Sequence, residues 1–193
     1  MNFIGSKTLE TERLILRKTE EQDLIFLWKT LLIDNVKKFY LVCKINEDWE
    51  KEKIWQYKKL AKAGNPDVFV WSVVLKDTNE VIGQVSAQES DKELSIRDVG
   101  WFINPIYQRK GYAYEATSKM LDYMFNEVGI DSIETCAAII NPASWLLMEK
   151  LGFVRDENVK KIIHYPYAGD YEVYSYHLNS YDYKNENKKM KLK

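Results

Sequence analysis

The segment spanning residues 99–114 holds the side chains best suited to binding a charged ligand. An apolar run ends at Ile103, a loop follows with Gln108-Arg109-Lys110, and a helical pattern opens at Gly111-Tyr112-Ala113. The first turn of a helix has backbone N–H groups without intrahelical partners and a partial positive charge, so it binds phosphate groups. The glycine and alanine allow close approach to the backbone, and the arginine and lysine supply countercharge. The loop predicts a diphosphate site; a surface turn with two solvated cations is the alternative.

Other common ligand sites are excluded by counting residues. No two of the eight glycines are two residues apart, so the dinucleotide fingerprint is absent, and the chain has no G-x-x-x-x-G-K-[ST] loop either. This excludes nicotinamide oxidoreductases and P-loop NTPases of the usual kinds. The two cysteines, Cys43 and Cys136, and the two histidines, His164 and His177, have no metal-ligand spacing. We therefore expect no metal site, and we expect both histidines to be ordinary strand residues.

Composition and charge indicate a globular protein of the cytoplasm. The chain has 193 residues, of which 46% are apolar and 30% charged. It has no apolar run near the ~20 residues of a membrane helix, and no signal-peptide core is visible. We expect a single domain over residues 1–180 and a lysine-rich, disordered tail over residues 181–193. The segment 184–193 carries +4 and the rest −5, so nucleic-acid binding is not expected.

The order of expected elements points to a mixed α+β fold. Strands are expected over residues 9–18, 68–75, 81–87, 93–103, 132–140, 153–164 and 171–178. Helices are expected over residues 20–32, 46–63, 111–128 and 141–151. In the second helix, Trp49, Ile54, Tyr57 and Leu60 recur at helical spacing and are the expected apolar face. In the last, Asn141 is the expected cap.

Three segments together resemble the GNAT superfamily of N-acetyltransferases. Gln108-Arg109-Lys110-Gly111-Tyr112-Ala113 is similar to its Q/R-x-x-G-x-G/A acetyl-CoA loop. The segment from Asn141-Pro142-Ala143-Ser144 to Leu151-Gly152-Phe153 is similar to its second motif. Residues 9–17, LETERLILR, resemble the first strand of the ribosomal-protein-alanine N-acetyltransferase-like branch. The resemblance covers residues 8–178.

The resemblance implies a fold and a coenzyme site. The fold is a single domain with a mostly antiparallel sheet of about seven strands, a splayed parallel pair and about four helices. The parallel strands are those that end at Ile103 and Ile140. In family members these two strands diverge, and the pantetheine arm of acetyl-CoA lies in the gap between them, where it pairs with Trp101, Phe102 and Ile103. Its diphosphate sits on the amides of Arg109, Lys110, Gly111, Tyr112 and Ala113, beside Gln108, and Asn141 and Ser144 face the pantetheine and sulfur. An amide near Phe102 is a candidate oxyanion donor.

Acetyl transfer to an amine also needs a base and a proton donor. Asp98 lies on the same strand face as Phe102 and is the leading candidate base; Glu134 and Glu89 are alternatives. Many relatives carry a tyrosine five residues before the final phenylalanine of the second motif, but this chain has Met148 there. Ser144 is the expected replacement as proton donor, and a hydroxyl bonded to its own helix is the alternative.

The expected activity is direct transfer of an acetyl group from acetyl-CoA to a primary amine through a tetrahedral intermediate. The acceptor is either a small-molecule amine or a protein N-terminus. Trp28, Trp49 and Trp55 are expected mainly in the core, and Tyr40, Tyr165 and Tyr167 are candidates for an acceptor pocket. Two alternatives are a non-catalytic acetyl-CoA binding module and a ribosome-associated protein that uses the basic tail. A monomer and a homodimer both fit the sequence.

Overall fold

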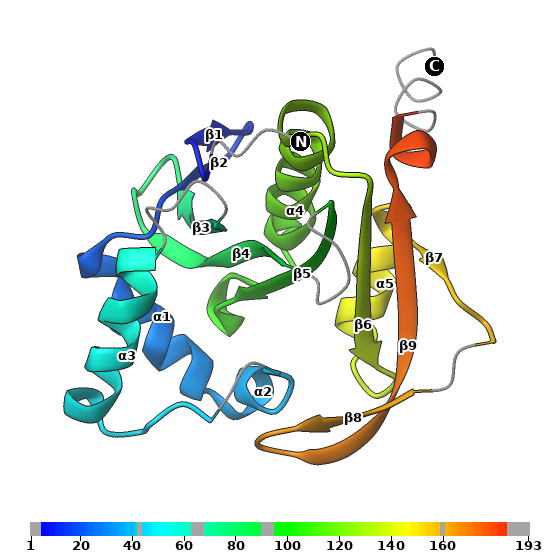
Figure 1. Ribbon diagram of the computed structural model, residues 1–193. Coiled ribbons are helices and arrows are strands. Elements are labelled where there is room, and N and C mark those ends of the chain that lie inside the picture. The colour runs from blue at the N-terminus through cyan, green and yellow to red at the C-terminus, as the bar shows by residue number, and fades with distance from the viewer. Residues whose placement is uncertain (1–4, 42–43, 63–67, 90–94, 159–160, 185–193) are drawn as a thin grey trace.

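The computed structural model describes residues 5–41, 44–62, 68–89, 95–158 and 161–184, with only the backbone described at Glu89. They form a nine-stranded sheet in the order β1-β2-β3-β4-β5-β6-β9-β7, with β8 also paired to β9 (Figure 1). The strands are β1 (Leu9–Glu10), β2 (Leu14–Arg17), β3 (Phe69–Leu75), β4 (Val81–Glu89), β5 (Ile96–Ile103), β6 (Ser132–Ala138), β7 (Val154–Arg155), β8 (Lys161–Tyr165) and β9 (Gly169–Asn179).

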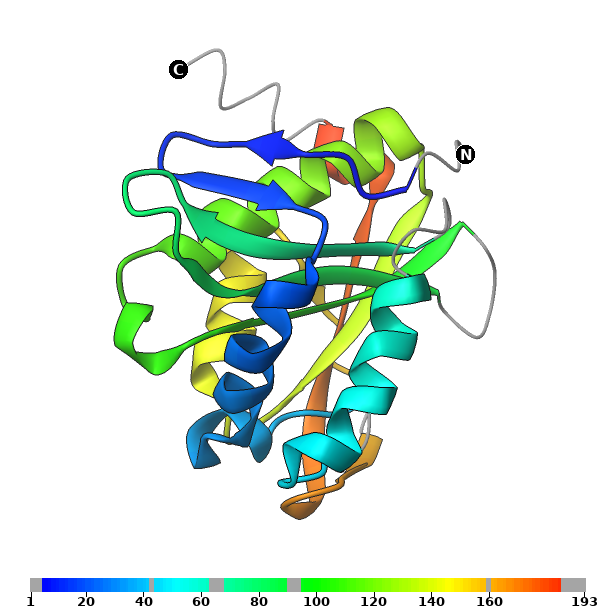
Figure 2. The ribbon, with the colours of Figure 1, turned by 90° about the vertical axis from the view of Figure 1, so that its left-hand side faces the viewer.

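Helices cover both faces of this sheet. They are α1 (Leu24–Leu32), α2 (Asp34–Lys37), α3 (Trp49–Lys62), α4 (Tyr112–Tyr123) and α5 (Pro142–Lys150), with short turns η1 (Glu21–Asp23) and η2 (Pro105–Tyr107) and a π-helical extension η3 (Met124–Val128). Figure 2 shows α1 and α3 in front of the strands and α4 and α5 behind them. The predicted mixed α/β fold with one domain is confirmed.

The parallel pair separates soon after it begins. The described strand pairs are antiparallel except β5 and β6, which share only the register pairs Ile96–Ser132 and Arg97–Ile133. Beyond these residues the two strands diverge, as Figure 1 shows. β5 continues along β4 and β6 along β9, so each strand keeps one partner and turns its other edge to the gap. The predicted splayed parallel pair is therefore present.

Two of the expected strands are each broken in two, which is why the sheet has nine strands rather than about seven. The first breaks at Thr11, whose hydroxyl accepts a hydrogen bond from the Leu14 amide at 2.9 Å, so that β1 folds back antiparallel on β2. The expected strand over residues 153–164 divides into β7 and β8, which pair with different parts of β9.

Only part of the predicted apolar face of α3 is packed: Trp49 and Leu60 are half-buried, and Trp49 contacts Trp28. Ile54 and Tyr57 are 59% and 41% exposed, whereas the buried residues of this helix are Glu52 and Gln56. Glu52 accepts hydrogen bonds from the Asn46 amide at 2.8 Å and from the Gln56 side chain at 2.7 Å. Both polar groups are satisfied where they lie, so the helix packs through a hydrogen-bonded face.

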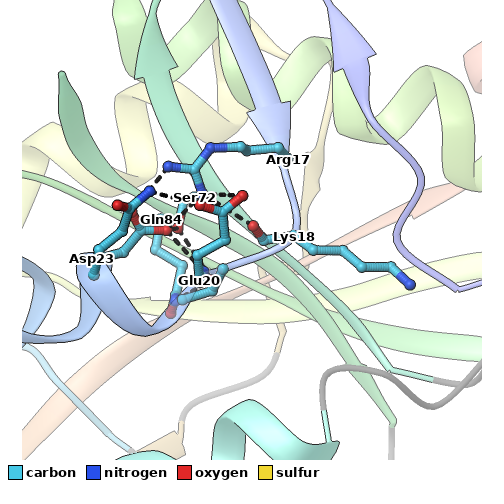
Figure 3. Close-up of polar contacts among 8 residues, drawn as sticks. Arg17, Lys18, Glu20, Asp23, Ser72 and Gln84 are labelled. Atoms are coloured by element: carbon cyan, nitrogen blue, oxygen red, sulfur yellow. Dashed lines mark hydrogen bonds and ion pairs between the residues drawn. The ribbon is translucent and has the colours of Figure 1, made fainter. Parts of the chain in front are cut away.

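A buried ion pair fixes the start of α1 against the sheet (Figure 3). The Arg17 guanidinium makes a two-pronged contact with the Asp23 carboxylate at 2.7 and 2.9 Å. The same carboxylate accepts hydrogen bonds from the Glu20 amide and the Ser72 hydroxyl, both at 2.9 Å. Burial would raise the pKa of Asp23, but Arg17, Glu20 and Ser72 outweigh it and lower that pKa. The pair thus joins α1 to β2 and β3.

The packed part of the chain extends beyond residue 180, the predicted end of the domain. Residues 180–184 are helical, and the Tyr183 ring stacks on Phe125 with 4.8 Å between centroids. Tyr183 is 8% exposed. The rest of the predicted tail lies outside the described residues. Within the described ranges, no helix is long and apolar enough to cross a membrane.

Candidate functional site

The loop between β5 and α4 presents free backbone amides at the start of a helix. After Ile103, Asn104 caps the short turn η2 by accepting a hydrogen bond from the Ile106 amide at 3.2 Å. Arg109 and Gly111 both take left-handed backbone angles, with φ of 64° and 84°. The first intrahelical bond of α4 comes from the Glu115 amide to the Gly111 carbonyl at 3.1 Å. The amides that precede Glu115, from Tyr112 onward, are therefore available to an anion.

The side chains of the predicted loop divide their roles. Gln108 donates its side-chain amide to the Ile103 carbonyl at 2.7 Å and so fastens the loop to the end of β5. Arg109 and Lys110 are exposed beside the start of α4, where their charges complement an anion.

The register of β5 decides which of its amides face the gap. The Asn104 amide donates to the Ile82 carbonyl at 2.8 Å, and Phe102 lies opposite Gln84 in the same ladder. Because bonded pairs alternate in an antiparallel ladder, the Phe102 amide points toward β4, whereas those of Trp101 and Ile103 point toward the gap. The register therefore leaves the Phe102 amide unsuited to the expected role of oxyanion donor, and the amides on either side of it are the ones that face the gap.

Glycine is required where β4 meets this part of β5. A Cβ atom at Gly83 would lie 2.2 Å from the Phe102 carbonyl oxygen, so no larger residue fits without moving the strands. The tight contact holds the edge of β5 that borders the gap.

At the start of α5, Asn141 and Ser144 carry side-chain polar groups that no described residue engages. Asn141 is the N-cap residue, as predicted, but its side chain makes no capping hydrogen bond. No described residue hydrogen-bonds the Ser144 hydroxyl, which removes the alternative in which that group is bonded to its own helix. Ser144 lies one turn before Met148 on the same side of the helix, and Met148 is buried in the core.

Asp98 lies where the parallel strands begin to diverge. Its side chain remains open to solvent but is flanked by Thr135, Cys136 and Lys161 from neighbouring strands. Burial raises the pKa of Asp98, and this effect outweighs the hydrogen bonds from Thr135 and the Val99 backbone and the charge of Lys161. The same surroundings raise the pKa of Cys136 to about 11, through burial and the nearby Asp98 charge.

The other candidate bases and the two histidines lie on or beside the strands of the sheet. Glu134 is on β6 opposite His177, and the side chain of Glu89 lies outside the described residues. His177 and His164 are strand residues, as predicted, with Nδ1 atoms 2.8 Å from Asp156 and 2.7 Å from Asp170. Among the residues that the structure describes, no group of three or more His, Cys, Asp or Glu could hold a metal; Cys43 is outside them.

An aromatic cluster covers the face of the sheet that carries Asp98 and Phe102. Trp28 and Trp49 lie 5.1 Å apart between ring centroids, and Trp28 donates to the Asn46 carbonyl at 2.9 Å. Phe102, Tyr40 and Tyr167 pack against this cluster and stay partly exposed.

Two aromatic expectations need correction. Tyr165 is 2% exposed, and burial raises its pKa to about 12, so it belongs to the core rather than to an acceptor pocket. Trp55 is not part of the aromatic cluster; the Lys59 ammonium lies 4.3 Å above its ring.

An open groove runs along α4 beside the loop that joins β5 to α4, residues 104–111, which is the predicted phosphate loop. Its lining includes Arg13, Gly111, Tyr114, Glu115, Lys119 and Lys150. Arg13 is not among the site residues predicted from the sequence, where it belongs to the expected strand over residues 9–18. The break of that strand at Thr11, which brings Arg13 to α4, has no strong turn residue to signal it.

Comparisons with known proteins agree with this arrangement. The family model described as an acetyltransferase (GNAT) domain matches residues 13–154. YnaD, an uncharacterized N-acetyltransferase of Bacillus subtilis (strain 168), is 31% identical over 155 residues, which cover 80% of this chain and 87% of that protein.

Two solved structures have the same fold at lower identity. Spermidine N-acetyltransferase from Vibrio cholerae, in complex with CoA and spermine, matches with a TM-score of 0.75 and 23% identity, covering 90% of this chain and 99% of that one. The ribosomal-protein-S5-alanine acetyltransferase from Vibrio fischeri matches with a TM-score of 0.72 and 21% identity, covering 92% and 99%.

Proposed function

The chain belongs to the GNAT family of N-acetyltransferases. From this premise we propose that the protein binds acetyl-CoA in the gap between β5 and β6 and transfers the acetyl group directly from it to a primary amine. The observation that carries the proposal is the combination of diverging parallel strands with a helix start whose first amides have no hydrogen-bond partner among the described residues. An extended amide-containing arm can pair with the strand edges, while its diphosphate meets the helix.

The coenzyme would be held mainly by backbone groups. We assign the diphosphate to the amides of the segment from Arg109 to Ala113, with Gln108 shaping the loop. The pantetheine arm pairs with the gap-facing groups of Trp101 and Ile103, beside Phe102. Asn141, whose side chain is unused within the protein, meets the arm from α5. The groove along α4 lies beside the loop; its lining carries charges of both signs, and the side chains of Lys119 and Lys150 are the groups there that suit a phosphate at the nucleotide end.

The reaction needs an uncharged amine, because an ammonium has no lone pair. Asp98 is the proposed base: its raised pKa brings its proton affinity closer to that of the amine than an ordinary aspartate's would be. Nitrogen then attacks the thioester carbonyl, and the gap-facing amides of Trp101 and Ile103 stabilise the tetrahedral oxyanion. Collapse of this intermediate breaks the carbon–sulfur bond. The nitrogen gives up its second proton to solvent, and Asp98 releases to solvent the proton that it took from the ammonium.

The leaving thiolate takes up a proton from the Ser144 hydroxyl. Ser144 and Met148 lie one turn apart, so the serine hydroxyl is on the side of α5 where relatives carry their tyrosine. Solvent at the open gap returns the proton to the serine. Met148 has no ionisable group and is buried, which leaves this task to Ser144.

The acceptor is either a small-molecule amine or a protein N-terminus. Of the two structural relatives, one is named for spermidine and the other for an alanine of ribosomal protein S5. A panel that includes spermidine, simple alkylamines, amino acids and alanine-first peptides separates the two classes by release of free thiol from acetyl-CoA.

The decisive experiment combines that panel with calorimetric titration of CoA. Binding of CoA together with thiol release on at least one amine supports the enzyme. Binding without release on any amine would favour the non-catalytic module, to which the missing tyrosine at Met148 gives some support. No heat from CoA would contradict the site itself.

A further inference from the structure

Arg13 reaches from the turn between β1 and β2 to the start of α4. Its Nη1 donates to the Lys110 carbonyl at 3.0 Å, and its Nε donates to Glu115 Oε2 at 2.7 Å. Its Nη2 lies 2.6 Å from the same carboxylate oxygen. The guanidinium also covers the Tyr112 ring at 4.6 Å from the centroid. One side chain thus touches the phosphate loop, the first helical residue and the first turn of α4.

Glu115 holds this arginine in place. Its other carboxylate oxygen accepts the Arg13 amide at 2.9 Å and the Thr11 hydroxyl at 2.5 Å. Burial would raise the pKa of Glu115, but the hydrogen bonds from Thr11 and Arg13 outweigh it and lower that pKa. The carboxylate therefore stays charged and fixes both the backbone and the side chain of Arg13.

The contact to Lys110 falls at the most constrained point of the loop. Lys110 lies between Arg109 and Gly111, the two residues with left-handed backbone angles. For arginine that conformation is uncommon and persists only where the surroundings impose it. A Cβ atom at Gly111 would lie 3.4 Å from Arg13 Nη2, so the guanidinium lies directly against the loop.

The pair also balances charge at the anion site. A carboxylate in the first turn of α4, so near the proposed diphosphate, would repel that ligand if it were alone. Arg13 neutralises Glu115 without leaving the loop.

We propose that Arg13, oriented by Glu115, is a positioning residue that holds the phosphate loop in the shape that binds coenzyme A. This inference rests on the proposed function, because the loop has no other assigned ligand. It predicts an effect on coenzyme affinity rather than on the chemical step.

The test is calorimetric titration of CoA with steady-state kinetics. Arg13→Gln is expected to weaken CoA binding about tenfold and to raise the KM for acetyl-CoA similarly, with kcat within about twofold. Arg13→Lys is expected to remain about threefold weaker than wild type, since an ammonium cannot span the Lys110 carbonyl and the Glu115 carboxylate together. The double variant Arg13→Gln/Glu115→Gln should bind no more weakly than Arg13→Gln, because both act through one network.

Lys7→Gln is the matched control. Lys7 pairs with Glu127 at the opposite end of the same helical segment, so its loss removes a comparable surface tether without touching the loop. It should leave CoA binding unchanged. Equal weakening by Lys7→Gln and Arg13→Gln would overturn the proposal, as would wild-type affinity in a folded Arg13→Gln protein. If Arg13→Gln does not fold, Arg13→Lys and Glu115→Gln provide the same comparison. Failure of the wild-type protein to bind CoA would instead contradict the proposed function.

Discussion

The hydroxyl group of Ser144, near the start of α5, has no hydrogen-bond partner among the described residues. If it protonates the leaving thiolate, Ser144→Ala should lower kcat by about tenfold or more, because general acid catalysis typically contributes 10²–10⁴-fold. The CoA dissociation constant should change little. Stopped assays of thiol release and calorimetric titration give the two numbers separately.

Ser132→Ala, at the beginning of β6 and away from the open end of the gap, is the control and should leave both numbers unchanged. A loss of CoA affinity that matches the loss of rate in Ser144→Ala would assign Ser144 to binding instead.

Asp98 links activity and stability to pH in opposite directions. As a base it works only when ionised, so kcat/KM should fall as pH drops through its raised pKa, at a higher pH than for an ordinary aspartate. Asp98→Asn should lower kcat/KM and remove this step from the pH–rate profile, while the step that belongs to the amine remains.

Stability should change the other way. A carboxyl whose pKa is raised on folding stabilises the protein at low pH, and this contribution is lost as pH rises through the folded-state pKa. Asp98→Asn should therefore be at least as stable as wild type at neutral pH, measured by denaturant unfolding. A less stable Asp98→Asn protein would show that the carboxylate has a structural role.

At the level of single elements, the start of α1 depends on the buried Asp23. Asp23→Asn leaves Arg17 without its charged partner and should reduce the free energy of unfolding by about 3 kcal/mol. Since the pKa of Asp23 is lowered, its contribution is present above the usual aspartate value and is lost as pH falls through the lowered one. The difference between wild type and Asp23→Asn should therefore shrink in acid.

Glu20→Gln provides the comparison for that measurement. Glu20 Oε1 lies 3.7 Å from Arg17 and the side chain is about half exposed, so its loss should cost less than about 1 kcal/mol. Urea unfolding of both variants at neutral and acid pH distinguishes the buried pair from the exposed one.

Elements with a regular apolar pattern were predictable from the sequence, and those held by polar contacts were not. In α4 and η3, which together fill most of the helix expected over residues 111–128, Ala116, Met120, Met124 and Val128 repeat at helical spacing and all are buried. In α3 the apolar pattern was right for Trp49 and Leu60 but wrong for Ile54 and Tyr57, because the fully buried positions are polar and depend on partners such as the Asn46 amide.

The candidate site shows the same division. The phosphate loop and the helix that begins at Asn141 follow from local sequence. The direction of the Phe102 amide and the reach of Arg13 to Lys110 depend on strand register and on a turn without glycine or proline. Such features arise from pairing between distant segments, which spacing along the chain does not reveal.

At the scale of the whole molecule, the packed structure continues into the basic C-terminal segment. A truncation meant to test ribosome association must therefore spare Tyr183, which stacks on Phe125. Tyr183→Ala should reduce the free energy of unfolding by about 3 kcal/mol, the cost of losing a buried aromatic side chain, whereas a truncation after Lys184 keeps that side chain. Co-sedimentation with ribosomes that disappears in the 185–193 truncation would support the ribosome-associated alternative, and unchanged sedimentation would remove it.

Because β5 and β6 diverge after two register pairs, the sheet consists of two halves that are joined only over this short stretch. In the free protein, the amide hydrogens of β5 should exchange with solvent at rates that alternate along the strand: fast at Trp101 and Ile103, and slow at Phe102. Binding of CoA in the gap should slow the exchange of the Trp101 and Ile103 amides and leave the rate of the Phe102 amide unchanged. Deuterium exchange detected by NMR would then show that the coenzyme bridges the two halves of the sheet.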